Sequence, residues 1–270
     1  LKLDFVKMSN NMWRGIKLNL KLDHIIHYIH QLESFKFPGE ILELQNGGRH
    51  HHLGTFNQIA PIKNSYIELL DVENESKLNN VAKTEEGRVS FATKIVQDHF
   101  KQGFKGICFR TKDIDQVKSS LENRGVDVIG PIDMERENKK GHQLSWRLLY
   151  IANPDYRVKP PFFIEWDNSK KQNLSQIHNF NLSSFKIKEV IITSTQRETT
   201  VSLWKEWYNL KIVNETATST DLKLETDEVI YKIEDGKDSG FHTLIMTDIN
   251  ATAPYSIFIR GAKYRFEPPN

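Results

Sequence analysis

The sequence predicts an α+β fold made of repeated units, each with one strand, a connection and about three further strands. Similar units begin at Lys21, Phe104 and Phe185, and a truncated fourth copy ends the chain. The spacing of roughly 80 residues is far too long for a solenoid repeat. Helices placed between antiparallel-type strands favour an α+β architecture over a doubly wound parallel sheet.

Composition limits the class of protein. The chain has 270 residues and 38% hydrophobic residues, enough for one large domain or two ordinary ones. Its 37 basic and 35 acidic residues give a net charge of +2, which provides no electrostatic basis for binding nucleic acid or an anionic membrane. Cys108 is the only cysteine, so an intrachain disulfide and a cysteine-rich metal site are excluded. We expect a reduced, soluble, cytoplasmic protein.

The first unit opens with an apolar and aromatic strand at 21–29. Alternation along this strand places His24, Ile26 and Tyr28 on one face. Pro and Gly pairs at 38–39 and 47–48 predict turns. The unit is completed by predicted strands at 40–44, 53–62 and 66–72.

The second unit follows an apolar stripe that predicts a helix within 86–101, ended by Gly103. A strand is predicted at 104–110, and Asp113 with Gln116 has the spacing of a capping box that opens a helix. Further strands are predicted at 126–132, 143–151 and 162–166, with a charged turn at 135–141.

A polar stretch rich in Asn, Ser and Lys separates the two halves of the chain and predicts a linker. The pattern then restarts with a strand at 187–193, a helix at 198–208 and strands at 221–224, 229–233, 241–247 and 255–260. We therefore expect an N-terminal extension at 1–20, a paired-module domain at 21–167, a linker at 168–184 and a smaller α+β half at 185–270.

Four stretches carry a resemblance to a known family. They read LDHIIHYI at 22–29, GGRHHHLGTFNQI leading to YIELLDV within 47–72, MERENKKGHQLSWRL at 134–148 and PFFIEWD at 161–167. They resemble the glyoxalase-like domain family of the vicinal oxygen chelate (glyoxalase/bleomycin-resistance/dioxygenase) superfamily. The resemblance implies paired βαβββ modules that form a cup-shaped sheet over 21–167, followed by a second, incomplete module pair.

In that superfamily a divalent metal is held by one residue on the first strand and a Glu on the last strand of each module. Transferred to this chain, the resemblance implies His24 and Glu68 from the first module and Glu165 from the second. The remaining ligand position falls on Gly106, which offers no ligand. One His and two Glu would suit Mn, Ni, Fe or Zn with open coordination positions. Glu68 and Glu165 are then also the expected catalytic bases.

Each of these residues has a structural alternative. His24 could be a buried histidine whose hydrogen bonds are satisfied within the protein. Glu68 and Glu165 stand in apolar strands, where an unpaired carboxylate is costly, so each needs a metal, an Arg partner or a water-filled cup. The run His50–His52 could replace the missing ligand, although consecutive histidines in a turn are more often exposed.

The expected substrate-binding residues surround the same cup. Three arginines could clamp a carboxylate, although Arg147 could equally neutralise Glu165 or Glu68. Cys108 shares a strand face with Gly106 and would line the cup, as a small hydrophobe rather than a nucleophile. The full set is Arg49, His50, Cys108, Arg136, Trp146 and Arg147.

Two functions from different classes fit these observations. The first is a cup for a small oxygen-rich or anionic molecule, acting as a metal-dependent isomerase, lyase or dioxygenase-like enzyme. The second is a metal-free protein that binds or sequesters a small molecule, of the drug-resistance type, without turnover. The sequence leaves open whether the protein is an enzyme. A role in dimerisation, giving a homodimer, is a third interpretation for the half at 185–267.

Overall fold

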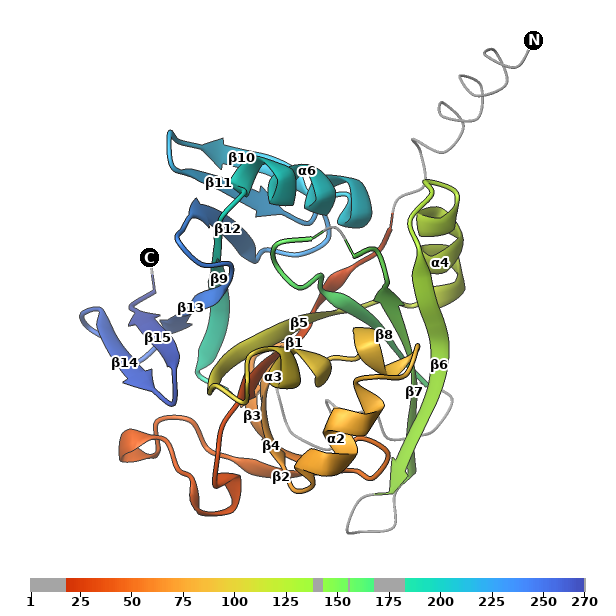
Figure 1. Ribbon diagram of the computed structural model, residues 1–270. Coiled ribbons are helices and arrows are strands. Elements are labelled where there is room, and N and C mark those ends of the chain that lie inside the picture. The colour runs from red at the N-terminus through yellow and green to blue at the C-terminus, as the bar shows by residue number, and fades with distance from the viewer. Residues whose placement is uncertain (1–17, 138–142, 155, 168–182, 270) are drawn as a thin grey trace.

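The computed structural model describes residues 18–137, 143–154, 156–167 and 183–269. They form two curved sheets of eight and seven strands (Figure 1). The first sheet has the order β2-β3-β4-β1-β5-β8-β7-β6. Its strands are β1 Lys21–Tyr28, β2 Gln45–His50, β3 Thr55–Ile62, β4 Ser65–Val72, β5 Gly103–Arg110, β6 Val128–Glu137, β7 Gln143–Ile151 and β8 Phe162–Trp166.

Two modules related by a pseudo-twofold axis form the first sheet. In each module the first and last strands pair in parallel, β1 with β4 and β5 with β8, while β1 and β5 join the modules antiparallel. The second module contains the expected helix, α4 Ile114–Glu122, and the Asp113 carboxylate accepts a hydrogen bond from the Gln116 backbone N–H at 2.9 Å. The paired βαβββ prediction is confirmed.

The first module differs from the prediction near its glycines. The segment around 38–40 forms a short 3₁₀ turn, and Gly47 and Gly48 lie within β2 rather than in a turn. A Cβ on Gly47 would lie 1.8 Å from the Asn57 side-chain oxygen, and the Gly48 N–H donates to that oxygen at 2.6 Å. The glycines therefore admit the Asn57 side chain between the strands.

A helical segment lies inside the curve of the first sheet (Figure 1). It comprises α2 Glu75–Val81, the 3₁₀ turn Gly87–Val89 and α3 Thr93–Gln97, where the sequence predicted one helix within 86–101. Leu78, Phe91 and Ile95 from this segment pack in one buried cluster with the inner face of the sheet. We call the segment 75–97 the inner cover.

The second sheet has the same arrangement of strands as the first, with one strand fewer. Its order is β10-β11-β12-β9-β13-β15-β14. One complete module is followed by β13–β15, where the structure shows no helix, so the predicted incomplete pair is confirmed. The elements are β9 Phe185–Ser194, α6 Arg197–Tyr208, β10 Lys211–Glu215, β11 Ser219–Lys223, β12 Ile230–Asp235, β13 Gly240–Asp248, β14 Tyr255–Ile259 and β15 Ala262–Glu267.

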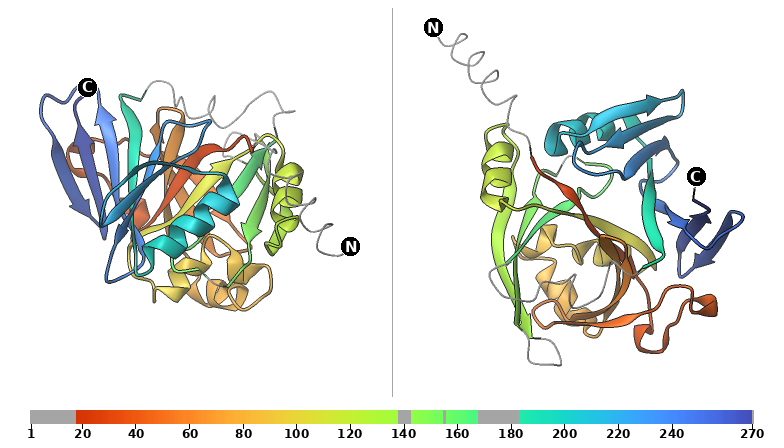
Figure 2. Two further views of the ribbon diagram at one scale, coloured as in Figure 1. Left: turned by 90° about the horizontal axis from the view of Figure 1, so that it is seen from above. Right: turned by 180° about the vertical axis from the view of Figure 1, so that it is seen from behind.

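The outer face of the first sheet and one face of the second share a single core, and Figure 2 shows the two sheets side by side. Phe109 contacts the rings of Tyr208 and Tyr231 at 5.2 and 5.5 Å between centroids. Leu18 and Leu20 are buried in the same core, so the end of the predicted extension is part of the fold. Residues 1–17 and 168–182, which hold most of the predicted extension and linker, lie outside the described residues.

Candidate functional site

The inner face of the first sheet carries a cluster of polar groups at its centre. Alternation along β1, β4 and β5 brings His24, Glu68 and Cys108 to this face. All three are buried: His24 is 3% exposed, Glu68 6% and Cys108 0%. Buried ionisable groups of this kind need partners that offset their lost hydration.

The His24 imidazole lies between two carboxylates. Its Nδ1 is 2.8 Å from Asp23 Oδ1 and its Nε2 is 3.3 Å from Glu68 Oε2. Asp23 reaches this position because β1 shifts register against β5 between Leu22 and His24, which is the effect of a β-bulge. The other Asp23 oxygen accepts a hydrogen bond from the Trp166 indole N–H at 3.1 Å. Sequence alternation alone would place Asp23 on the opposite face.

The Glu68 carboxylate is fixed from its other side by groups of the first module. The Asn57 amide donates a hydrogen bond to Glu68 Oε1. Asn57 can take this position because Gly47 has no side chain that would clash with it. His50 Nε2 lies 4.0 Å from the same oxygen, and its Nδ1 lies 3.0 Å from the Thr55 hydroxyl. Both histidines therefore direct Nε2 towards Glu68, each with Nδ1 held by an oxygen.

Aromatic rings enclose the cluster. Tyr66 stacks on the His24 imidazole at 4.7 Å and Phe162 meets it edge-on at 5.6 Å. Phe91 of the inner cover lies 5.4 Å from the His50 ring and 5.8 Å from Phe162. The site therefore lies beneath the inner cover, and its ionic interactions act in a medium of low polarity.

Cys108 lies beside these charges. Ligand atoms of Asp23, His24 and Cys108 all lie within 4.8 Å of one another. Burial, and then the charges of Asp23 and Glu68, raises the pKa of the Cys108 thiol well above its ordinary value. The thiol is thus neutral at physiological pH, as expected for a packing residue rather than a nucleophile.

Glu165 does not join this cluster. It lies on the outer face of β8, like Phe163, whereas Phe162 and Ile164 face inward. Its carboxylate accepts hydrogen bonds from Arg147, at 2.8 Å from Nε, and from the Ile114 N–H at 3.2 Å, at the start of α4. The expectation that Glu165 shares a metal or acts as base with His24 and Glu68 is corrected: the pleat of the strand turns it to the other side.

Gly106 lies on the inner face opposite Ile26, at the position where the resemblance places the fourth ligand. A Cβ there would meet Ile26 Cδ1 at 3.8 Å, an ordinary contact, so the site is compatible with a side chain that the sequence does not supply. The second module therefore contributes neither of the two ligands expected of it. His50, from β2, is the nearby imidazole that could compensate.

The other expected substrate-binding residues are dispersed. Arg49 is exposed, 2.5 Å from Glu73, and lies over the Phe56 ring. Trp146 packs on the inner face, 5.4 Å from Trp166. Arg136 lies on β6 opposite Leu144 in register, and its side chain is outside the described part of the structure.

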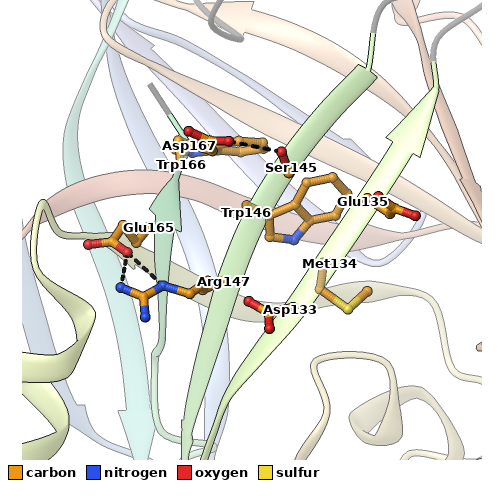
Figure 3. A pocket seen from close by; sticks show the side chains of 9 residues that line it. All are labelled: Asp133, Met134, Glu135, Ser145, Trp146, Arg147, Glu165, Trp166 and Asp167. Carbon is orange, nitrogen blue, oxygen red and sulfur yellow. Dashed lines mark hydrogen bonds and ion pairs between the residues drawn. The ribbon is translucent and has the colours of Figure 1, made fainter. Parts of the chain in front are cut away.

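Arg147 forms ion pairs with two carboxylates of the protein. Besides Glu165 it binds Asp115, with Nη1 at 2.9 Å from Oδ2. This is the neutralising role that the sequence left open as an alternative to a substrate clamp. An open cavity of about 630 Å³ lies beside the pair (Figure 3). It is lined by Asp133, Met134, Glu135, Ser145, Trp146, Arg147, Glu165, Trp166 and Asp167.

The glyoxalase-like domain family matches residues 22–208, more than half of the chain. A hypothetical protein from Staphylococcus aureus is 51% identical over 93% of this chain and all of its own, with a TM-score of 0.89. No curated protein matches the sequence.

Two more distant structures share the fold. The Mn(II)-bound glyoxalase from Novosphingobium aromaticivorans is 10% identical, with a TM-score of 0.54 over 94% of this chain and 83% of its own. A mutant of 4-hydroxymandelate synthase from Streptomyces coelicolor is 6% identical, with a TM-score of 0.53 over 94% of both chains. The chain belongs to the glyoxalase-like domain family and has the vicinal oxygen chelate fold.

Proposed function

We propose that the protein is a metal-dependent enzyme that acts on a small, oxygen-rich organic molecule at the inner face of its first sheet. The observation that carries the proposal is the His24 imidazole held between Asp23 and Glu68. A metal-binding histidine typically has its second ring nitrogen held by a carboxylate, which fixes the ring and raises its basicity. Asp23 stands in that relation to His24.

The donor set fits a divalent transition metal. His24 Nε2 and the Glu68 carboxylate would hold the ion, and His50 and Cys108 are the nearby groups that could complete the ligand set. Imidazole and carboxylate together suit Mn, Fe, Ni or Zn. A metal bound there would act as a Lewis acid on two neighbouring oxygens of a substrate.

The residues of the chain have separate roles in this scheme. Asp23 and Trp166 orient the His24 ring, and Asn57 orients Glu68. The Glu68 oxygen that does not bind the ion would accept a proton from the substrate carbon. The surrounding rings exclude water, which strengthens the electrostatic interactions. Reaction classes that use these parts are isomerisation, elimination and dioxygenation.

Loading of untagged protein with metal tests the proposal. After dialysis against Mn, Fe, Ni or Zn in separate samples, we expect about one equivalent of one metal by elemental analysis. His24→Ala should lose it, whereas His51→Ala, in the exposed part of the histidine run, should retain it. Retention of metal by His24→Ala would contradict the assignment.

A metal-free binding protein is the second candidate. The observation in its favour is that Asp23, His24 and Glu68 already satisfy one another beneath the inner cover. Such a protein would bind none of the four metals in stoichiometric amount. A wild-type protein that stays metal-free in every sample would therefore favour this candidate over the enzyme.

A further inference from the structure

The second sheet ends in an unusual edge. All five residues of β10 are exposed, and no described strand pairs with its outer side. Two of them are large and apolar, with Ile212 41% exposed and Val213 51% exposed. An open edge presents backbone N–H and C=O groups that can pair with another strand.

The sequence of β10, Lys-Ile-Val-Asn-Glu, is complementary in charge to itself. If two copies of the strand pair antiparallel about Val213, Lys211 of each copy lies opposite Glu215 of the other. Opposite charges on facing residues stabilise a strand pair, and like charges destabilise it. A twofold arrangement forms this contact twice, as an isologous interface requires.

We propose that β10 is a dimerisation edge that pairs with β10 of a second copy of this chain. The two seven-stranded sheets would then continue as one sheet across a twofold axis. Ile212 and Val213 would be covered by the partner, which accounts for their exposure in the single chain. The register is set by the two Lys211–Glu215 pairs.

Contacts within the chain leave these charges available. Lys211 Nζ is 3.9 Å from Glu225 and Arg197 Nη1 is 3.9 Å from Glu215, distances typical of weak surface pairs. The Thr220 hydroxyl donates to Glu215 at 3.2 Å. A register shift against β11 falls between Ile212 and Asn214, so Val213 is the extra residue of a bulge. Because the strand is short and bulged, we expect a reversible dimer rather than a permanent one.

The other edge of the sheet lacks this complementarity. The strand β14 has the sequence Tyr-Ser-Ile-Phe-Ile, with Phe258 77% exposed. Without charges it specifies no register. Pairing of β10 with β14 of another copy would also be heterologous and would extend into filaments instead of closing as a dimer.

Analytical ultracentrifugation over a wide concentration range tests the proposal. We expect a monomer–dimer equilibrium for the wild type. Lys211→Glu and Glu215→Lys should each weaken it about tenfold, because each places two like-charged pairs in the interface. The double variant Lys211→Glu/Glu215→Lys restores both opposite-charge pairs and should restore the dimer. Lys237→Glu, the same charge change on the exposed connection between β12 and β13, which is not part of the proposed strand pair, should have no effect.

Thermal unfolding of each variant shows whether the chain still folds. A wild type that remains monomeric at every concentration overturns the proposal, as does a dimer that neither single variant weakens. Failure of the double variant to restore a dimer that both single variants weaken overturns the register. Growth of the mass beyond a dimer would instead indicate pairing of β10 with β14.

Discussion

Glu68 and Glu165 lie on opposite faces of the first sheet and therefore meet different partners. Both Glu68 and Glu165 lie within apolar strands, and the sequence correctly indicated that each needs a partner. Glu68 faces inward to His24, while Glu165 faces outward to Arg147. Counting along β8 from Phe162, which packs beside His24, places Glu165 on the outer face, but the contact between Phe162 and His24 is known only from the fold.

Asp23 was missed for a related reason. Strict alternation predicts that neighbours on a strand point to opposite faces, yet Asp23 and His24 contact each other through their side chains. The register shift in β1 that allows this depends on pairing with β5 and has no clear local signal in the sequence. The hydrogen bond from Trp166 to Asp23 joins strands of different modules, so it too depends on the fold.

The buried hydroxyl of Tyr231 should lower the stability of the fold. It has no hydrogen-bond partner within the described ranges, while the Tyr208 hydroxyl donates to the Pro161 carbonyl at 2.9 Å. Tyr231→Phe should stabilise the fold by about 1 kcal/mol because it removes an unsatisfied polar group, and Tyr208→Phe should destabilise it by about as much. Urea denaturation measures both, and a destabilised Tyr231→Phe would contradict the assignment.

Among the elements, those with strong periodicity were predicted best. The helix α4, with its Asp113 cap, and the helix α6 begin within one residue of their predicted starts. The inner cover was predicted poorly. Its apolar residues pack against a curved sheet and do not form one continuous helix face. The sequence therefore did not predict α2, and the single helix expected within 86–101 is a 3₁₀ turn and a short α-helix in the structure. The glycines of β2 were misjudged because their role is to admit Asn57.

The inner cover should control access to the site. Phe91 packs between His50 and Phe162, and Cys108 beneath it is fully buried. Phe91→Ala should cost about 3 kcal/mol of stability. It should also speed the reaction of Cys108 with a thiol reagent in the native protein, since it opens the cover locally.

Phe258→Ala is the matched control for this prediction, because Phe258 is 77% exposed and lies on the second sheet. It should change neither the stability nor the labelling of Cys108, the only cysteine of the chain. Equal labelling rates for Phe91→Ala and the wild type would show that access to Cys108 does not pass through the cover.

For the whole molecule, the order of the modules could be predicted from the sequence, but the way in which the two halves meet could not. The outer face of the first sheet and one face of the second form one core. The buried His27 connects the two halves, because its Nδ1 lies 2.7 Å from the Tyr264 hydroxyl and its Nε2 lies 3.0 Å from the Arg260 carbonyl. Every helix within the described ranges is too short or too polar to span a bilayer. The division at 168–184 stays a prediction.

Because of His27, the stability of the fold should depend on pH. Burial lowers the pKa of His27 from 6.5 to about 4. Between these values the unfolded chain binds a proton that the folded chain does not, so stability should fall as pH drops from 6.5 to 4, by about 3 kcal/mol in total. His27→Gln should reduce this loss, measured by urea denaturation at several pH values. An unchanged pH dependence in the variant would refute the role of His27.

The proposed metal site lies on the inner face of the first sheet, at His24 and Glu68, and excludes Glu165. Metal titration of Glu68→Gln and Glu165→Gln, followed by elemental analysis, compares two identical changes on opposite faces of one sheet. We expect Glu68→Gln to lose stoichiometric metal. Glu165→Gln should keep it, with a loss of about 1 kcal/mol in stability from its weakened Arg147 pair. Loss of metal in Glu165→Gln with retention in Glu68→Gln would show that the metal site is on the outer face instead.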